Sequence, residues 1–313
     1  MKSAIIRALA LTLALAAVPA AAADRLTVLL DWFVNPDHAA LIVARDNGHF
    51  ARHGLQVELV APADPNAPPK LVAAGQADLA VSYQPQLHLL AGEGLPLVRV
   101  GALVAQPLNT LIALEGGPIG KIADLKGRKV GFSVGGFEEA VLGAMLETAG
   151  LGLKDVTLIN VNFNLSTALM SGQVDAVIGG FRNFELNQLA IEKRAGRAFL
   201  PEDNGVPPYD ELIVVAHRDR VDAGRTRRFL AALGEATEWI KENPDAAWTI
   251  FVRSGRELDN ELNRRAWHDT LPLLADDPAA IDLARYEAFA EFLLKKGMLK
   301  RPVPVDRYVR DMR

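Results

Sequence analysis

The chain of 313 residues contains no cysteine and has no excess of positive charge. The absence of cysteine excludes a disulfide framework, thiolate chemistry and lipid attachment at an N-terminal cysteine. The net charge of −4 offers no basic field for nucleic acid or anionic lipid, so nucleic acid is not an expected partner. A long apolar run is also missing: Ala8 to Val18 stops at Pro19, short of the roughly 20 residues that a membrane span needs.

The first residues have the order of a secretory signal. Lys2 and Arg7 precede the apolar run, and Pro19 is followed by the small residues 20–23. This pattern predicts a signal peptide over residues 1–23 with cleavage after Ala23. Without Lys2 and Arg7 the net charge becomes −6. Because no cysteine is available to tether the mature chain, we expect a free, soluble protein in the periplasm.

The segment from Leu29 to His38 organises the rest of the interpretation. A β-rich stretch, Leu26 to Leu30, runs into an acid, two aromatic residues, an amide and a proline, and a helical pattern begins at Ala39. In an open α/β sheet, loops at the carboxyl ends of strands line the ligand crevice. The segment therefore favours a ligand-binding loop, and the alternative is a surface loop whose Trp32 packs on the core.

The same plan occurs twice along the chain. Residues 75–81, a turn feeding a strand, are echoed by residues 172–178 almost residue for residue. Each half carries two polar loops at strand ends, at 31–38 and 82–86 in the first and at 133–139 and 181–185 in the second. With length for two domains and 50% hydrophobic residues for two cores, the sequence predicts two α/β lobes whose loops meet across a cleft.

The last third of the chain is predicted to be mainly helical. A strand over 211–216 is expected to lead back to the first lobe. The amphipathic stretch 226–242 stops before Pro244, and three further helices are expected to begin near Ala246, Asn260 and Pro278.

Five segments carry a resemblance to a known family. They are residues 30–38, 130–139, 160–165, 179–185 and 207–212, with the sequences LDWFVNPDH, VGFSVGGFEE, NVNFNL, GGFRNFE and PPYDEL. In this order they resemble the periplasmic substrate-binding proteins of ABC importers, in the branch that binds thiamine pyrimidine precursors. The resemblance spans nearly the whole mature chain.

That resemblance implies an α/β, two-lobed periplasmic-binding-protein type II fold with a cleft between the lobes. Lobe I is expected to comprise residues 24–105 and 217–313 and lobe II residues 106–216, with crossovers near Gln106 and Ala216. It also implies capture of an aminopyrimidine, such as hydroxymethylpyrimidine or formylaminopyrimidine, and delivery to the membrane permease and ATPase of an importer. No cofactor is expected.

An enzyme stands among the relatives of that family. The eukaryotic synthase of the same pyrimidine is similar in fold and uses a lysine, which binds pyridoxal phosphate, and a histidine. Those positions fall on Ser82 and Gln86 here, and a Schiff base needs an amine. The synthase's cysteine-rich segment is also absent, so we expect a binding protein and not an enzyme. Two alternatives stay open: a binding protein for another flat vitamin such as riboflavin, and a pyrimidine-processing enzyme.

Aromatic and acidic side chains of the four loops are the main candidates for ligand contact. An aromatic ring stacked on a heterocycle contributes about 1 to 3 kcal/mol, and carboxylates accept hydrogen bonds from amino groups. Phe33, Phe132 and Phe163 are expected in the core, and Glu139 is expected only to favour its helix start. The candidate ligand-binding residues are Asp31, Trp32, Asn35, His38, Tyr83, Gln84, Gly136, Phe137, Glu138, Phe181, Asn183 and Glu185, with Asp37 as a further acid.

Other patterns speak against competing chemistry. Gly131, Gly135 and Gly136 have neither the dinucleotide nor the P-loop spacing, and two acids follow them, which disfavours an anion. The four-residue spacing of His49 and His53 lacks the accompanying glutamate of a zinc helix, so no metal site is expected. No catalytic residue is predicted.

Overall fold

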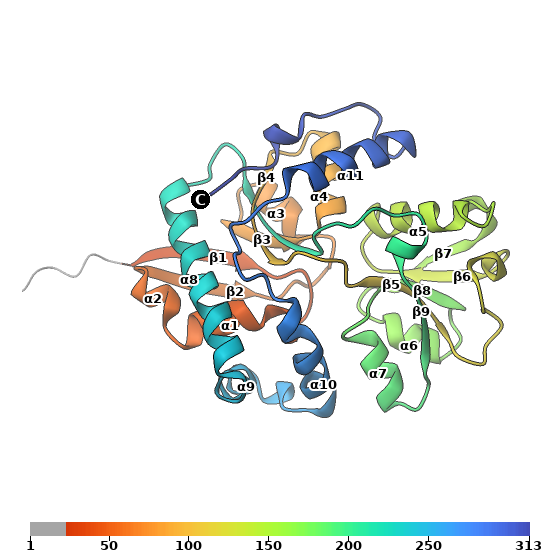
Figure 1. Cartoon of the computed structure of the whole chain (residues 1–313), viewed down its shortest axis with the longest axis horizontal. Coiled ribbons are helices and arrows are strands. Elements are labelled where there is room, and N and C mark those ends of the chain that lie inside the picture. The colour runs from red at the N-terminus through yellow and green to blue at the C-terminus, as the bar shows by residue number, and fades with distance from the viewer. Residues whose placement is uncertain (1–22) are drawn as a thin grey trace, which may run out of the picture.

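A computed structural model describes residues 23–313, so the predicted signal peptide lies, apart from Ala23, outside the described residues. Two five-stranded sheets form the two halves of the molecule (Figure 1), in the orders β2-β1-β3-β10-β4 and β7-β6-β8-β5-β9. The first sheet consists of β1 (Asp24–Leu29), β2 (Leu55–Val60), β3 (Leu79–Ser82), β4 (Leu97–Val104) and β10 (Leu212–His217). The second consists of β5 (Asn109–Leu114), β6 (Lys129–Phe132), β7 (Thr157–Asn160), β8 (Ala176–Phe181) and β9 (Gly196–Phe199).

Both sheets follow one plan. Strands β1, β2 and β3 are parallel to one another, as are β6, β7 and β8, while β10 and β5 are antiparallel to their neighbours. In each sheet the fourth strand, β10 or β5, is the first strand that the chain forms after it crosses from the other half of the molecule. The strand expected over 211–216 is β10, and its pairing with β3 and β4 of the first sheet agrees with the expected return to the first lobe. The expected boundary of the second lobe at residue 216 therefore lies too late in the chain. The chain thus returns to the first sheet before Leu212.

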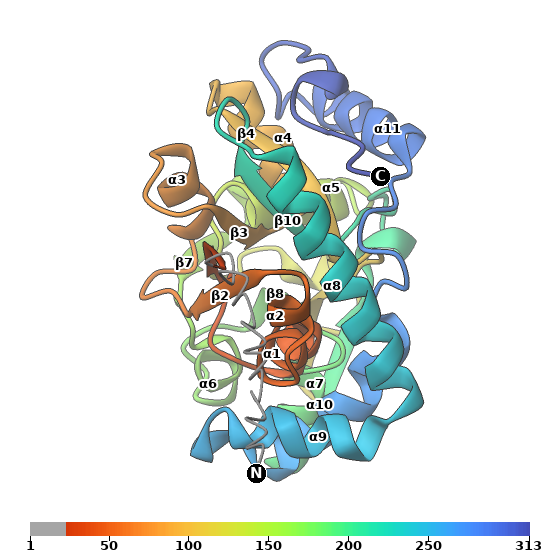
Figure 2. The same cartoon turned by 90° about the vertical axis from the view of Figure 1, so that its left-hand side faces the viewer.

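The helices form two groups, one with each sheet, and each group follows the strands of its sheet along the chain. With the first sheet lie α1 (Ala39–Asp46), α2 (His49–Arg52), α3 (Pro68–Ala73) and α4 (Gln84–Glu93), and with the second α5 (Phe137–Glu147), α6 (Leu165–Met170) and α7 (Glu185–Ile191). After β10 come α8 (Ala223–Glu242), α9 (Pro244–Arg253), α10 (Glu261–Thr270) and α11 (Leu283–Lys295), which return to the first half (Figures 1 and 2). We call the first sheet with α1–α4 and α8–α11 the first lobe, and the second sheet with α5–α7 the second lobe.

Local signals explain most helix boundaries. The helical pattern that begins at Ala39 is divided into α1 and α2, because Gly48 between them adopts a left-handed conformation with φ 76°. Helix α8 begins where Asp222 accepts a hydrogen bond from the backbone N–H of Arg225. The three later helices start at Pro244, Glu261 and Leu283, close to the expected positions except for the last.

The echoed turns of the two lobes have a matching structural role. Oδ2 of Asp78 accepts from the backbone N–H of Thr27 at 2.8 Å, and Oδ2 of Asp175 accepts from that of Lys129 at 2.8 Å. Each aspartate therefore ties the turn before one strand to the neighbouring parallel strand. The role of both aspartates is structural.

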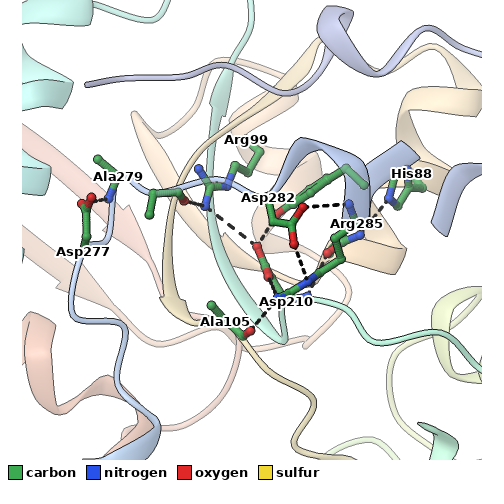
Figure 3. Close-up of polar contacts among 11 residues, drawn as sticks. His88, Arg99, Ala105, Asp210, Asp277, Ala279, Asp282 and Arg285 are labelled. Atoms are coloured by element: carbon green, nitrogen blue, oxygen red, sulfur yellow. Dashed lines mark hydrogen bonds and ion pairs between the residues drawn. The ribbon is translucent and has the colours of Figure 1, made fainter. Parts of the chain in front are cut away.

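Two crossover segments, residues 105–108 and 200–211, connect the lobes and are bonded to each other. Oε2 of Glu211 accepts from the backbone N–H groups of Leu108 and Asn109 at 2.7 and 2.8 Å. Nη1 of Arg285, on α11, donates to the carbonyl of Ala105 and to Oδ1 of Asp210, both at 2.7 Å (Figure 3). The two crossovers thus form one braced hinge.

Candidate functional site

A pocket lies between the two lobes and is lined by residues of both. We call it the cleft pocket, and it is lined by Asp31, Trp32, Asn35, Tyr83, Phe137, Glu138, Leu165, Gly179, Phe181, Phe184 and Glu185. Eight of these eleven residues are among the twelve candidates from the sequence.

Aromatic rings from both lobes surround the pocket. Tyr83 of the first lobe stacks on Phe137 of the second, with ring centroids 5.1 Å apart and an interplanar angle of 25°. Trp32 meets Phe163 edge to face at 4.6 Å and packs in the hydrophobic cluster of the second lobe while also lining the pocket. Trp32 therefore lines the pocket and packs in a hydrophobic cluster at the same time, so the two placements are not alternatives for this residue.

Phe33 differs from the expectation that it lies in the core. Its side chain is 40% exposed, and its ring faces Phe163 and Phe184 of the second lobe at centroid distances of 6.4 and 5.8 Å. The strand has ended before this residue, so its side chain follows the loop and not the alternation of the sheet. Phe132 and Phe163 are partly buried against the hydrophobic clusters.

Asp31 is held by two side chains of its own lobe. Its Oδ1 lies 2.9 Å from Nε2 of His38, and its Oδ2 accepts from the Tyr83 hydroxyl at 2.8 Å. Nδ1 of His38 accepts from the backbone N–H of Asn35 at 3.3 Å, so Nε2 carries the proton that is donated to Asp31. His38 therefore orients a pocket acid without lining the pocket.

Glu138 is buried at the first turn of α5, with its carboxylate against β8 of the same lobe. Its Oε2 accepts from the backbone N–H of Ser133 at 2.7 Å. A Cβ at Gly179 would lie 2.3 Å from Oε1, so only glycine leaves room for this carboxylate. Burial raises the pKa of Glu138 to about 8, against the lowering effect of the backbone donors.

Glu185 stands in the equivalent position at the start of α7. Its Oε2 accepts from the backbone N–H of Phe181 at 2.7 Å. Burial raises the pKa of Glu185 to about 8 as well, and the nearby Asp37 adds to the effect. The lining thus contains three acids and no lysine, arginine or histidine.

Three further candidates point elsewhere. Gln84 accepts from the backbone N–H of Asp210 at 2.8 Å and lies 3.2 Å from His88, beneath the hinge. Gly136, with φ 80°, belongs to the loop before α5 and lines an outer groove. Asn183 donates to Asp37 and Thr270 of the first lobe at 2.6 and 2.8 Å. These residues support the site without facing the cavity.

Sequence reasoning missed Leu165, Gly179 and Phe184 among the lining residues. Gly179 and Phe184 lie in the segment 179–185 that carries the family resemblance, so the segment was found but not these members of it. Leu165 ends the segment 160–165, which also carries the resemblance, but its residue type gave no further signal, because an apolar residue at a helix start is as common in a core as in a pocket.

The positions that correspond to the synthase lysine and histidine are bonded to each other. The Ser82 hydroxyl donates to Oε1 of Gln86 at 2.8 Å, and both side chains are buried. Within residues 23–313, no group of three or more metal-ligating side chains is placed to hold an ion. The part of the chain that the structure describes also has no helix of the length and apolarity of a membrane span.

Comparison with known proteins places the chain among defined relatives. The NMT1/THI5 like family model matches residues 35–247. A protein of Haemophilus influenzae, described by name as a thiamine biosynthesis protein, is 52% identical over 292 residues, which cover 93% of each chain. The formylaminopyrimidine-binding protein of Halalkalibacterium halodurans is 36% identical over 259 residues, covering 82% of this chain and 78% of that protein.

Two more distant likenesses bear on fold and chemistry. The alkanesulfonate-binding protein of Xanthomonas axonopodis pv. citri, bound to MOPS, superposes with a TM-score of 0.73 at 17% identity, covering 93% of this chain and 99% of that one. This confirms the expected two-lobed α/β fold. A fungal 4-amino-5-hydroxymethyl-2-methylpyrimidine phosphate synthase, from Uromyces fabae, is 27% identical over 268 residues, 81% of this chain and 78% of that enzyme.

Proposed function

The chain belongs to the NMT1/THI5-like family, and from this premise we propose that it is the solute-binding component of an ABC importer and captures a thiamine pyrimidine precursor. The observation that carries the proposal is the lining of the cleft pocket, which combines aromatic rings from both lobes with three acids and no base. A flat heterocycle rich in N–H donors fits such a lining. Carboxylates in the lining would repel an anionic ligand, which argues against a sulfonate or nitrate as the ligand.

The two buried glutamates match the hydrogen-bonding pattern of an aminopyrimidine. The exocyclic amine of this ring donates, whereas its ring nitrogens accept. Because the pKa of Glu138 and of Glu185 is raised to about 8, each carboxyl exists as acid and as carboxylate near neutral pH. The acid donates to a ring nitrogen and the carboxylate accepts from the amine. A pair of such groups therefore offers both halves of the required pattern.

A binding role fits the pocket better than the synthase reaction of the fungal relatives. The lining contains no amine that forms a Schiff base, and Ser82 and Gln86 lie outside it. The family resemblance also implies that the protein works in the periplasm with a permease and an ATPase. Export through the predicted signal peptide is part of this proposal.

Isothermal titration of the purified mature chain tests the proposal. Formylaminopyrimidine and hydroxymethylpyrimidine are the probes, with riboflavin and an alkanesulfonate as comparison ligands. We expect saturable binding of at least one pyrimidine and none of the sulfonate. Preference for riboflavin would move the assignment to another flat vitamin. Pyridoxal phosphate released from the denatured protein, or turnover of it, would instead favour the enzyme.

A further inference from the structure

Asn66 and Asn183 are among the side chains that bridge the lobes outside the cleft pocket. Asn66 lies in the loop between β2 and α3 of the first lobe. Its Oδ1 accepts from the backbone N–H of Gly135 at 2.8 Å, and its Nδ2 donates to the carbonyl of Ser133 at 3.1 Å. One amide of the first lobe thus makes two hydrogen bonds to the loop that precedes α5 in the second lobe.

The second bridge runs in the opposite direction. Asn183 of the second lobe donates through Nδ2 to Oδ1 of Asp37 at 2.6 Å and to the Thr270 hydroxyl at 2.8 Å. Asp37 precedes α1, and Thr270 ends α10, so this amide connects α7 with two separate segments of the first lobe. Figures 1 and 2 show α7 beside α10, with α3, the helix that follows Asn66, well away from them.

The Asn66 side chain is held in place by its own loop, and the Asn183 bridge is buried. Asp64 fixes the turn of Asn66, because its Oδ1 accepts from the backbone N–H of Asn66 at 2.9 Å and from its Nδ2 at 3.0 Å. Asn183 and Asp37 are each only 2% exposed. A side chain that is already held in place loses less conformational entropy when it forms a hydrogen bond. Removal of one partner of a buried hydrogen bond costs more free energy than removal at the surface, because the other partner is left unpaired.

The bridged loops also hold groups of the cleft pocket. Ser133, which receives Asn66, donates its backbone N–H to Glu138. Asn183 stands between Phe181 and Glu185, which line the pocket. Neither asparagine is among the lining residues. Opening of the lobes about the braced crossovers would break the four hydrogen bonds that Asn66 and Asn183 make between the lobes. The pocket groups of each lobe would stay on their own loops.

We propose that Asn66 and Asn183 form a two-point latch that holds the lobes closed, so that they set the dwell time of the ligand without touching it. The inference rests on the proposed function only in that the cleft takes a ligand, whose identity is immaterial to the latch. A residue that stabilises only the closed state acts mainly on dissociation, because the encounter occurs with the lobes open.

The kinetic test compares Asn66→Ala, Asn183→Ala and the double variant with the wild type. Asn243→Ala is the matched control, because the Asn243 amide donates to the carbonyl of Trp239 at 3.0 Å within the first lobe. Stopped-flow fluorescence, with Trp32 in the cleft as reporter and formylaminopyrimidine as probe, gives both rate constants. We expect each latch variant to dissociate about tenfold faster, with an association rate within about threefold of wild type and no change in the control.

A second measurement needs no ligand. Because the chain has no cysteine, Glu58→Cys and Lys154→Cys introduce one exposed labelling site in each lobe. Single-molecule energy transfer between two dyes then gives the fraction of closed molecules. We expect this fraction to fall in the double latch variant and to stay unchanged with Asn243→Ala, while circular dichroism shows the native fold in all of them.

Unchanged dissociation rates in both single variants, together with an unchanged closed fraction, would overturn the latch. A lower association rate with normal dissociation would also overturn it, since the asparagines would then act on the open state. If the wild type fails to bind formylaminopyrimidine, the proposed ligand is wrong, and a fall in the closed fraction of the double variant still supports the latch.

Discussion

Gly179→Ala is the substitution whose effect the structure specifies most closely. Gly179 has φ 97°, a conformation that costs an L-residue about 1 to 2 kcal/mol. The new Cβ would also lie 2.3 Å from Oε1 and 2.4 Å from Cδ of Glu138. The carboxyl must move away and give up its hydrogen bond from Ser133, which costs about 0.5 to 1.5 kcal/mol, because a carboxyl with a pKa of about 8 is mostly uncharged at neutral pH. We expect a total loss of about 1.5 to 3.5 kcal/mol in the free energy of unfolding.

Gly172→Ala is the matched control. Gly172 has φ 75°, and nothing lies within 4 Å of a Cβ built on it, so it carries the backbone cost alone. Urea unfolding of the ligand-free variants measures both losses, and calorimetric titration with the pyrimidine measures affinity. Gly179→Ala should lose more stability than the control by roughly the value of the Glu138 hydrogen bond, and should lose affinity by at least about tenfold.

A double-mutant cycle isolates the clash. In the Glu138→Ala variant the carboxyl is gone, so adding Gly179→Ala to it should lower the free energy of unfolding far less than Gly179→Ala does in the wild type. Equal stability of Gly179→Ala and Gly172→Ala, with wild-type affinity in both, would refute the reasoning, because Glu138 would then not be seated against Gly179.

Three further outcomes follow from the same contacts. Glu185→Gln should weaken pyrimidine binding about tenfold, or about 1.4 kcal/mol, because an amide accepts more weakly than a carboxylate; calorimetry decides this, and unchanged affinity would make Glu185 a loop-bracing acid. Trp32→Ala should lower the free energy of unfolding by roughly 3 to 5 kcal/mol as well as weaken binding, since Trp32 packs in the cluster of the second lobe; loss of affinity at normal stability would contradict that packing. The stability that Glu138 and Glu185 contribute to the ligand-free protein should be fully present below pH 4.5 and be lost as the pH rises through about 8, because burial raises the pKa of both from 4.5 to about 8 and the folded state then binds more protons than the unfolded chain. Urea unfolding between pH 5 and pH 8 checks it, and a variant with both glutamates changed to Gln should show a flatter dependence.

The sequence by itself determined the order of strands, loops and helices and the position of the binding loops. Strand and helix periodicities are local properties, and glycines and prolines mark the turns between them, so residues 29–46 could be interpreted without their surroundings. The repeated turn before β3 and β8 indicated two lobes of one plan. The chemical types in the four loops, aromatic and acidic, pointed to a flat donor-rich ligand.

Only the tertiary structure decided which loop residues face the pocket. Asn183 bonds to Asp37, which is 146 residues away in the chain, and so turns from the ligand to the opposite lobe. Gln84 turns to Asp210, and Gly179 enters the lining because Glu138 from another element needs its space. Such outcomes depend on contacts between segments distant in the chain, which no local pattern of apolar and polar residues records.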